Sequence, residues 1–404
     1  MKKAIIFGSF IPILLTLISS LRAQLPVGGW QTHLPYYYCQ KIMVTPDRVF
    51  CSSTSGLFYF GLSDNSVSTL TKTDGLSDNG VTTMRWSEEN QLALLAFDNA
   101  NIDILKDGEI INIPDIFKKQ IPGDKTIYNI YFEGTNALLS CGFGIVSLDL
   151  ERYEITDTYY IGDEGEALKI NQVASDQTYL YAATADGIRR AEKDNPFLID
   201  YNSWEKVTTL PNPNGAYTGV AAYAERIFVL YDAPSGNPDK IYYLDNGNWS
   251  DLQGITDEKI YEIHRDQDYL LVVGEERVFT YNASLLLSDV LESGTPRSAG
   301  MDPQGDLWVA DFGKGMVYYG EGGTQVYRPN GPYSSNVYDI ASADGKVYAV
   351  PGGVTQTYNN LFQSASLYIY QDMRWRSEIN YEYRDIISLE TVPGEPGHLY
   401  GGTW

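Results

Sequence analysis

The stretch TLTKTDGLSDNGVTTMRW, from Thr69 to Trp86, gathers Asp74, Asp78 and Asn79 between two runs of β-forming residues. Their oxygen atoms are the hard ligands that Ca²⁺ prefers, and two carboxylates can also divide the roles of general acid and general base. Asp-Gly and Asn-Gly pairs are, however, typical of turns. The stretch therefore allows two interpretations, an acidic site or a structural turn.

A second copy of the stretch decides between these interpretations. VYRPNGPYSSNVYDI repeats the pattern 256 residues later, with Asn330 and Gly331 in the places of Asp74 and Gly75. Because the acids of one active site have no reason to recur in this way, we interpret both copies as turns between strands. We expect Asp74 and Asn330 to bond their own backbone and the two glycines to take positive φ.

The histidines form no catalytic motif. His33, His264 and His398 occupy different repeat positions, and no HExxH, GxSxG, GKS/T or CxxC pattern occurs. His264 follows Ile263 in a predicted inner strand, where it could line a central channel, although a structural role is commoner for such a histidine. The sequence predicts no enzyme and no catalytic residue.

Acidic clusters are the remaining candidates for chemistry. Asp163, Glu164 and Glu166 in IGDEGEAL could bind Ca²⁺ or serve a glycosidase. Such runs are more often solvated loops, and neither DNANID nor DNGNW has the spacing of an EF-hand loop. We expect no cofactor and no metal site, with Ca²⁺ as the alternative.

The three cysteines, Cys39, Cys51 and Cys141, are too few for a disulfide framework. Each lies in an apolar β-run, and a free cysteine there behaves as a small hydrophobic side chain. We expect buried thiols, and a single disulfide is the alternative.

The elements that must position these residues are β-strands. The 32 Tyr, 7 Trp and 37 Gly, with short runs of Val, Ile and Thr, favour an all-β chain. Residues 1–23, MKKAIIFGSFIPILLTLISSLRA, are typical of a signal peptide, with an uncleaved anchor as the alternative. No second long apolar run follows, so we expect no transmembrane span in the mature chain.

The formal charge is −23, and removal of Lys2, Lys3 and Arg22 would make it −26. This charge argues against nucleic acid, or an anionic bilayer, as a partner held by bulk electrostatics. The predicted signal peptide indicates an exported protein.

Repeats of about 43 residues organise the chain. Each unit has an inner strand with an apolar centre, then two β-runs joined by a turn, and in many units an aromatic outer strand. The nine centres recur at intervals of 36 to 47 residues, at Ile42, Met84, Ile130, Val173, Val220, Ile263, Ala299, Ile340 and Ile386. Four antiparallel strands in such a period are typical of a β-propeller blade.

We therefore predict an all-β fold, a β-propeller of four-stranded blades. Seven units would form a first propeller at residues 24–330, and two more, at 331–404, the truncated start of a second propeller. Trp30 lies in a predicted outer strand with no inner strands before it. We expect this strand to close the first ring by pairing with its last blade.

Ordered motifs give these repeats a family resemblance. LTKTDGLSDNGVTTM is similar to the propeller repeat in the periplasmic sensor regions of hybrid two-component regulators. GGWQTHLPYY, DNANIDIL, CGFGIVSLDLERYEITDTYYIG and ATADGIRRAE, in that order, resemble the PorZ-like β-propeller family of the Bacteroidetes type IX secretion system. The second resemblance is clearest over Gly28 to Trp204.

The second resemblance implies two seven-bladed propellers and a C-terminal sorting domain in a protein displayed on the cell surface. It implies a non-enzymatic scaffold of the attachment complex, whose partners are secretion-system proteins, including a sortase-like protease, and as a further ligand anionic lipopolysaccharide. Because the chain's charge would repel that ligand, a local basic patch of Arg189, Arg190 and Lys193, or bridging by Ca²⁺, would have to bind it.

Two other classes of function remain open at this point. The first is the ligand-sensing ectodomain of a hybrid two-component regulator. The second is a propeller glycosidase or lyase, which would need acids that converge at one end of the channel.

Overall fold

The computed structural model describes residues 30–255, 258–392, 394–395 and 397–403. The predicted signal peptide, residues 1–23, lies outside these ranges. The strands described below belong to one compact unit, Thr32–Trp404. In the described ranges, no helix is long and apolar enough to cross a membrane.

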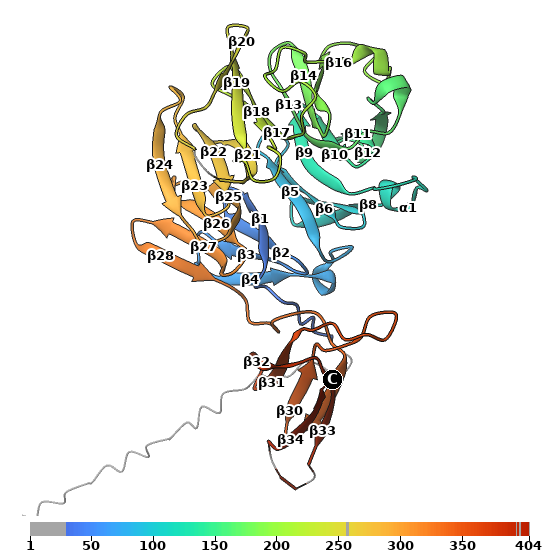
Figure 1. The fold of residues 1–404 in the computed structure, drawn as a ribbon, viewed down its shortest axis with the longest axis vertical. Helices are drawn as coiled ribbons and strands as arrows, with labels where there is room; N and C mark the ends of the chain where they lie inside the picture. Colours follow the sequence, from blue (N-terminus) through green and yellow to red (C-terminus); the bar gives the residue numbers. More distant parts are fainter. Residues whose placement is uncertain (1–29, 256–257, 393, 396, 404) are drawn as a thin grey trace, which may run out of the picture. The chain divides into compact units, whose positions relative to one another are not determined.

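Seven four-stranded sheets follow one another along residues 39–327 of the described chain, and we call them blades 1 to 7 (Figure 1). In each blade, strands that are consecutive in sequence pair antiparallel, so every blade is a simple meander. Blades 1 to 4 contain β1 Cys39–Val44, β2 Arg48–Ser53, β3 Leu57–Gly61, β4 Val67–Leu70; β5 Val81–Ser87, β6 Leu92–Phe97, β7 Ile102–Lys106, β8 Glu109–Ile113; β9 Ile127–Glu133, β10 Asn136–Cys141, β11 Gly144–Asp149, β12 Glu154–Tyr159; and β13 Ile170–Ser175, β14 Tyr179–Thr184, β15 Gly187–Glu192, β16 Glu205–Lys206.

Blades 5 to 7 have the same pattern. They contain β17 Tyr217–Tyr223, β18 Arg226–Tyr231, β19 Lys240–Asp245, β20 Asn248–Asp251; β21 Ile260–Asp266, β22 Tyr269–Gly274, β23 Arg277–Tyr281, β24 Leu287–Glu292; and β25 Pro296–Met301, β26 Leu307–Asp311, β27 Gly315–Gly320, β28 Gly323–Tyr327. Short helices occur only in connections of the described chain: α1 Asp115–Lys118 and the 3₁₀ turns η1 Lys72–Asp74, η2 Asp163–Gly165 and η3 Tyr201–Ser203.

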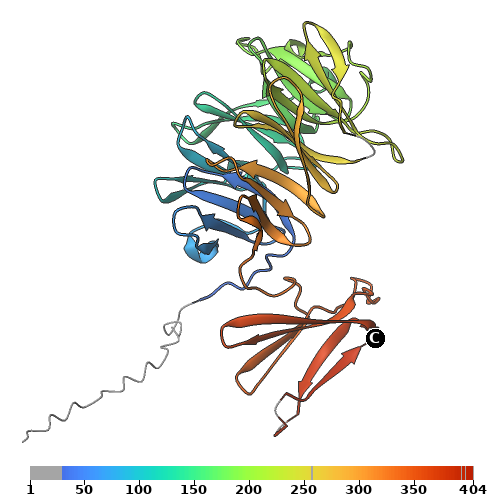
Figure 2. The same cartoon turned by 90° about the vertical axis from the view of Figure 1, so that its left-hand side faces the viewer.

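Two further sheets follow blade 7 and carry the red end of the colour scale in Figure 2. One has four strands, β29 Asp339–Ala343, β30 Lys346–Val350, β31 Ser364–Gln371 and β32 Arg374–Arg384. The other has two, β33 Ile386–Thr391 and β34 Leu399–Thr403. All nine predicted repeat centres lie in the first strand of their sheet, so the predicted fold class is confirmed. The domain limits, 24–330 and 331–404, stay predictions.

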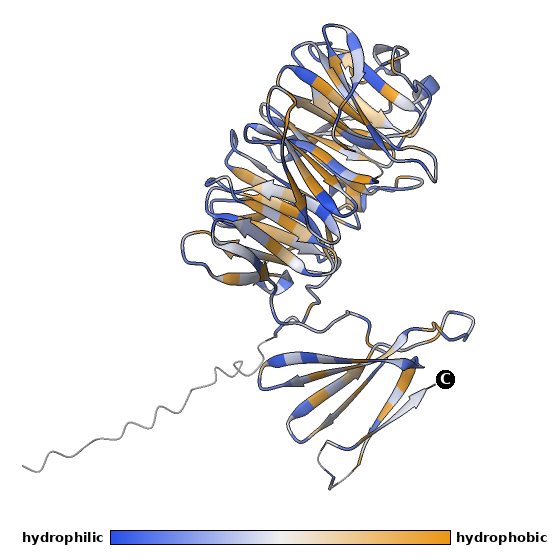
Figure 3. Cartoon of the chain, turned by 60° about the vertical axis from the view of Figure 1, so that its left-hand side comes forward, coloured by the Kyte–Doolittle hydropathy of each residue, from blue (hydrophilic) through white to orange (hydrophobic). Residues whose placement is uncertain are grey.

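The core of the ring is divided into layers between neighbouring blades. Strand β6 shows why, because all six of its residues are buried. Leu92, Leu94 and Ala96 pack toward blade 3, whereas the alternate residues Ala93, Leu95 and Phe97 pack toward blade 1. Side chains of a strand alternate between the two faces of its sheet, so a blade with a neighbour on each face is apolar on both. Figure 3 shows hydrophobic residues in orange along the strands of the blades.

A bulge bends the first strand of every blade of the ring. Its pairing with the second strand skips one residue in each case: Gln40, Thr82, Tyr128, Asn171, Thr218, Tyr261 and Arg297. A bulge leaves one residue unpaired and increases the local twist of the strand. The repeat therefore sets a common geometry at the inner edge of all seven blades.

The predicted closure of the ring through Trp30 is wrong. Trp30 lies in no strand and is 87% exposed, and blade 7 takes all four of its strands from residues 296–327. Instead, β25 lies beside β1, and the side chains of blades 7 and 1 share one apolar cluster. We call this contact the closing seam.

Trp308 is the largest side chain of the closing seam and is 1% exposed. Its ring centroid lies 5.0 Å from that of Phe60 in blade 1 and 5.6 Å from that of Tyr327. The indole Nε1 donates a hydrogen bond of 2.9 Å to Asp302 Oδ2, so its polar atom is also satisfied. Side-chain packing between blades 7 and 1 therefore closes the ring, in place of the predicted pairing with an N-terminal strand.

The acidic stretch at Asp74 is an inter-blade turn, as predicted. Thr71 caps η1, and Asp74 Oδ2 accepts hydrogen bonds from the backbone N–H and the hydroxyl of Thr71 at 2.9 and 2.8 Å. Gly75 ends the turn at φ 111°, a conformation that favours glycine. Asp78 accepts from the Lys72 ammonium at 3.2 Å. The carboxylates are therefore used by the turn itself.

The second copy differs from this prediction. Asn330 bonds not its own backbone but that of Trp375, donating to its carbonyl at 2.9 Å and accepting from its N–H at 2.6 Å. Gly331 has no positive φ. A Cβ there would lie 2.0 Å from the carbonyl oxygen of Leu34, so close backbone approach explains the glycine.

We predict that Trp308→Ala destabilises the protein by about 3–5 kcal/mol, because the change leaves a cavity in the closing seam. Urea unfolding of the purified chain measures this. Trp30→Ala is the matched control and should leave the midpoint unchanged. Equal losses in the two variants would instead support closure through the N-terminal segment.

Candidate functional site

The first strands of the blades surround a channel, and one position in each strand is polar or small. These residues directly follow the bulge and precede the apolar centre, and we call them the polar ring: Lys41, Thr83, Asn129, Gln172, Gly219, Glu262 and Ser298. All except Gly219 line one cavity of about 220 Å³. The channel therefore has a polar wall, although each blade is apolar on both faces.

An ion pair crosses the polar ring between blades 1 and 6. Lys41 Nζ lies 2.9 Å from Glu262 Oε1, and both side chains are largely buried. Burial by itself raises the pKa of Glu262, but the Lys41 ammonium, His264 and the Ser298 hydroxyl outweigh it and leave the pKa below its ordinary value. Ser298 also accepts the backbone N–H of Ile42 at 3.2 Å, which joins blades 7 and 1.

Gln172 makes a similar link from blade 4. Its Nε2 donates to the carbonyl of Ile263 in blade 6 at 3.3 Å and passes the position of Gly219 in blade 5. A Cβ on Gly219 would lie 2.7 Å from Ile263 Cγ2 and 3.3 Å from Gln172 Oε1. The glycine in the polar ring therefore provides the space for this link.

His264 lines the channel together with Arg85, Gln172 and Arg265. Its Nδ1 is buried and has no hydrogen-bond partner among the described residues. Arg85 donates to the carbonyl of Ile130 in blade 3 at 3.4 Å, and burial lowers its pKa despite nearby acidic groups. His264 therefore lines the channel, which the sequence left open beside the commoner structural role.

The predicted basic patch consists of residues that are already paired. Arg189 is buried and bonds Asp163 Oδ1 at 2.7 Å, whereas Arg190 lies 2.6 Å from Glu205 Oε1. Lys193 Nζ lies 3.2 Å from Glu133 Oε1.

Arg189 and Arg190 are neighbours in β15, so their side chains point to opposite faces of the sheet. Arg190 also lies over the ring of Tyr179, 4.4 Å from its centroid. The structure therefore does not bring the three predicted residues into one free cationic surface, and their binding role stays a prediction.

The acidic run at residues 163–166 is an exposed turn, η2, and the Arg189 guanidinium lowers the pKa of Asp163. Glu164 has positive φ, at 56°. Within the described ranges, no three His, Cys, Asp or Glu side chains converge to hold a metal ion. Binding of Ca²⁺ stays untested.

The three cysteines are buried and free, as expected. Burial raises the pKa of the Cys51 and Cys141 thiols, so both remain protonated at neutral pH. Neither thiol is therefore an activated nucleophile.

Sequence reasoning missed the polar ring, although a signal was present. The repeat alignment on the apolar centres places Lys, Thr, Asn, Gln, Gly, Glu and Ser at the preceding position in the seven units. Polar residues that recur beside a buried centre indicate a shared non-core environment. Which of them pair across the channel depends on distances that the alignment does not contain.

We predict that Lys41→Met destabilises the protein at neutral pH by more than an exposed pair is worth, about 1 kcal/mol, and by at most the 3–5 kcal/mol of a fully buried one. Because the folded pKa of Glu262 is lowered, the stabilisation is present above its ordinary pKa and is lost as the pH falls through the folded value. Urea unfolding across this pH range should show the difference shrinking in acid.

Lys41→Met combined with Glu262→Gln is the matched control, because it removes both charges. It should recover much of the stability. A pH-independent loss in Lys41→Met would contradict the role of the ion pair.

Comparisons with known proteins place part of the ring in a family. Residues 49–205 match the family described as TSS9, PorZ, N-terminal beta-propeller domain. No curated protein sequence matches the chain. The fold is similar to that of the beta-propeller domain of Myceliophteria thermophila Cps50 (Swd1), at 10% identity and a TM-score of 0.52 over 72% of this chain and 98% of that one.

The fold is also similar to PorZ of Porphyromonas gingivalis, described as an essential bacterial surface component of the type-IX secretion system. The identity is 21% and the TM-score 0.80, over 93% of this chain and 51% of the PorZ chain. The chain thus spans about half the length of that protein. The family match over residues 49–205, together with this fold, confirms the predicted resemblance to the PorZ-like β-propeller family.

Proposed function

We propose that the protein is a non-enzymatic, exported scaffold of the type IX secretion attachment complex. Its partners would be other secretion-system proteins, including a sortase-like protease, and anionic lipopolysaccharide would be a further ligand. The observation that carries the proposal is the match of residues 49–205 to the PorZ N-terminal propeller domain. A location in the periplasm or at the cell surface follows from the same family.

The use of the channel residues supports a scaffold rather than an enzyme. Lys41, Glu262 and Gln172 make contacts between blades, so their polar atoms are engaged in holding the ring. Catalytic acids and bases need instead to reach a substrate atom directly. The predicted acids of a glycosidase, at 163–166, lie on an exposed turn away from the polar ring.

The C-terminal sheets support the start of a second propeller. Ile340, the centre of β29, is 60% exposed, whereas every centre of the seven-bladed ring is 8% exposed or less. In the ring, such a centre is covered by the neighbouring blades. β33 already lies beside β29 on one side, and Leu389 N–H donates to Asp339 Oδ2 at 2.7 Å.

Reading the coding sequence beyond Trp404 tests this second ring and the alternative function together. Further repeats and a sorting domain would support the scaffold. A transmembrane helix followed by a kinase would instead support a two-component regulator.

We predict that the protein, tagged and purified from envelopes of its own host after mild cross-linking, brings secretion-system proteins with it. The closing-seam variant Trp308→Ala should lose them in proportion to its loss of folded protein, since the ring presents the loops that bind. Mass spectrometry identifies the partners. An envelope fraction without any secretion component, or turnover in a glycosidase screen, would overturn the scaffold proposal.

We predict that Arg189→Glu/Arg190→Glu weakens binding of anionic lipopolysaccharide if β15 is its site. Because both arginines are paired with carboxylates, the ligand must displace Asp163 and Glu205. Lys72→Glu/Lys240→Glu gives the same change in net charge, at two lysines that are also paired with carboxylates, and is the control. Unchanged binding in the arginine variant, measured on immobilised lipopolysaccharide, would eliminate this site.

A further inference from the structure

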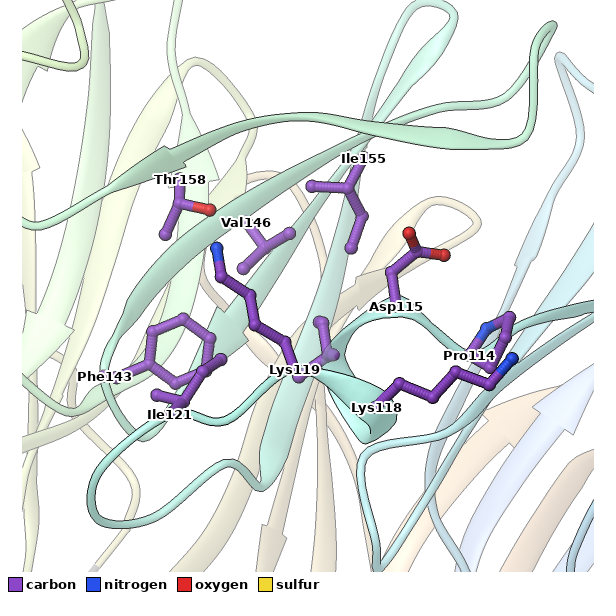
Figure 4. A pocket seen from close by; sticks show the side chains of 10 residues that line it. Pro114, Asp115, Lys118, Lys119, Ile121, Phe143, Val146, Ile155 and Thr158 are labelled. Carbon is purple, nitrogen blue, oxygen red and sulfur yellow. The ribbon is translucent and has the colours of Figure 1, made fainter.

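A pocket with a volume of about 580 Å³ lies between blade 3 and the connection that joins blades 2 and 3 (Figure 4). Its apolar wall includes Phe143, Val146 and Ile155, all from blade 3, and Ile121 from the connection. These side chains belong to, or pack against, the apolar layer between the two blades. The volume is in the range of pockets that hold one small molecule. We call it the blade-2/3 pocket.

The rim of this pocket is built by the connection between β8 and β9, residues 114–126, which contains α1. Ile116 anchors α1 in the apolar layer. Lys125 then holds the connection in place, because its Nζ donates to the carbonyls of Ile116, Phe117 and Lys119 at 3.1, 2.8 and 3.3 Å. The pocket is therefore shaped before any ligand arrives, which lowers the entropic cost of binding.

Lys118 and Lys119 line this rim without an ion pair among the described residues. Most other lysines of the ring are neutralised; examples are Lys72 by Asp78 and Lys206 by Asp186. In a chain of formal charge −23, two adjacent unpaired cations beside an apolar cavity are an exception. They provide a local positive potential where the wall is apolar.

We propose that the blade-2/3 pocket binds a small molecule with an apolar body and one anionic group, such as a medium-chain carboxylate. The apolar body would lie against Phe143, Val146 and Ile155. The anionic group would lie at the end of the pocket where Lys119 extends toward Thr158, whose hydroxyl can donate a hydrogen bond (Figure 4). This proposal does not depend on the proposed scaffold function or on lipopolysaccharide.

One acidic residue, Asp115, also lines the pocket and sets its polarity. In Figure 4 its carboxylate lies near Ile155, on the other side of the pocket from the Lys119 ammonium. An anionic group beside Asp115 would be repelled, whereas the Lys119 end attracts it. The pocket thus favours one orientation of an anionic ligand and disfavours a cationic head group at the Lys119 end.

Calorimetric titration of the purified chain tests the proposal with three probes of equal chain length: decanoate, decyl phosphate and decyltrimethylammonium. The carboxylate and the phosphate should bind at one site, about tenfold more tightly than the cation, a ratio that corresponds to one or two exposed charge contacts. Their affinity should fall as salt is raised. Equal affinity for all three probes would show apolar adsorption only, and no binding would refute the site.

Two variants locate the binding. Lys119→Glu should weaken decanoate about tenfold, since the charge contact with the anionic group is reversed, whereas Lys346→Glu, which makes the same charge change outside the ring, should not. Ile155→Ala should weaken decanoate while preserving the preference for the anion. Unchanged affinity in both pocket variants would place the ligand elsewhere and overturn the proposal. The head-group preference of the unaltered protein remains a test if a variant fails to fold.

Discussion

The closing seam between blades 7 and 1 is the contact on which the ring depends. Each blade is a sheet with two apolar faces, so it is stable only with a neighbour on each side. An open array would leave the outer faces of its first and last blades in water. Trp308 of blade 7 packs against Phe60 of blade 1, so each of these two faces is covered by the other. The other inter-blade layers repeat the same solution with aliphatic and aromatic side chains, such as Phe228 and Phe279 between blades 5 and 6.

Closure also explains the polar ring. The first strands meet around the channel, where their inner edges have no further strand to pair with. Backbone N–H groups there need other acceptors, and Ser298 provides one for Ile42 across the seam. The Lys41–Glu262 ion pair and the Gln172 amide reach between blades that are not neighbours in sequence. The channel residues therefore make a second set of contacts, which hold the blades in place relative to one another.

The pairing of cationic side chains with carboxylates also bears on function. Carboxylates outnumber cations in the chain, and most arginines and lysines of the ring, including Arg189 and Arg190, are paired with one. A binding surface for an anion must then either displace such pairs or use the few unpaired cations. This distinction separates the proposed lipopolysaccharide site on β15 from the blade-2/3 pocket, where Lys118 and Lys119 are available and an apolar wall is close.

Particular residues show which features of the structure could be predicted from the sequence. Ile42, Met84 and Ile263 were predictable as strand centres because burial on one face of a repeated strand leaves a periodic pattern in the sequence. The turn at Asp74 was predictable because Asp-Gly chemistry is local. The turn at Asn330 was not, since its amide bonds Trp375, 45 residues later.

The sequence by itself determined the repeat, the four-stranded blade, the turn at Asp74 and the buried cysteines, because all of these rest on local or periodic patterns. Only the tertiary structure decided how the ring closes, which charges pair and where a pocket opens. The sequence pointed to Trp30 as the residue that closes the ring, but Trp308 is the tryptophan that packs against Phe60. Likewise, Arg189 and Lys119 are equal as cations, and only folding gives the first a carboxylate and leaves the second beside an apolar cavity.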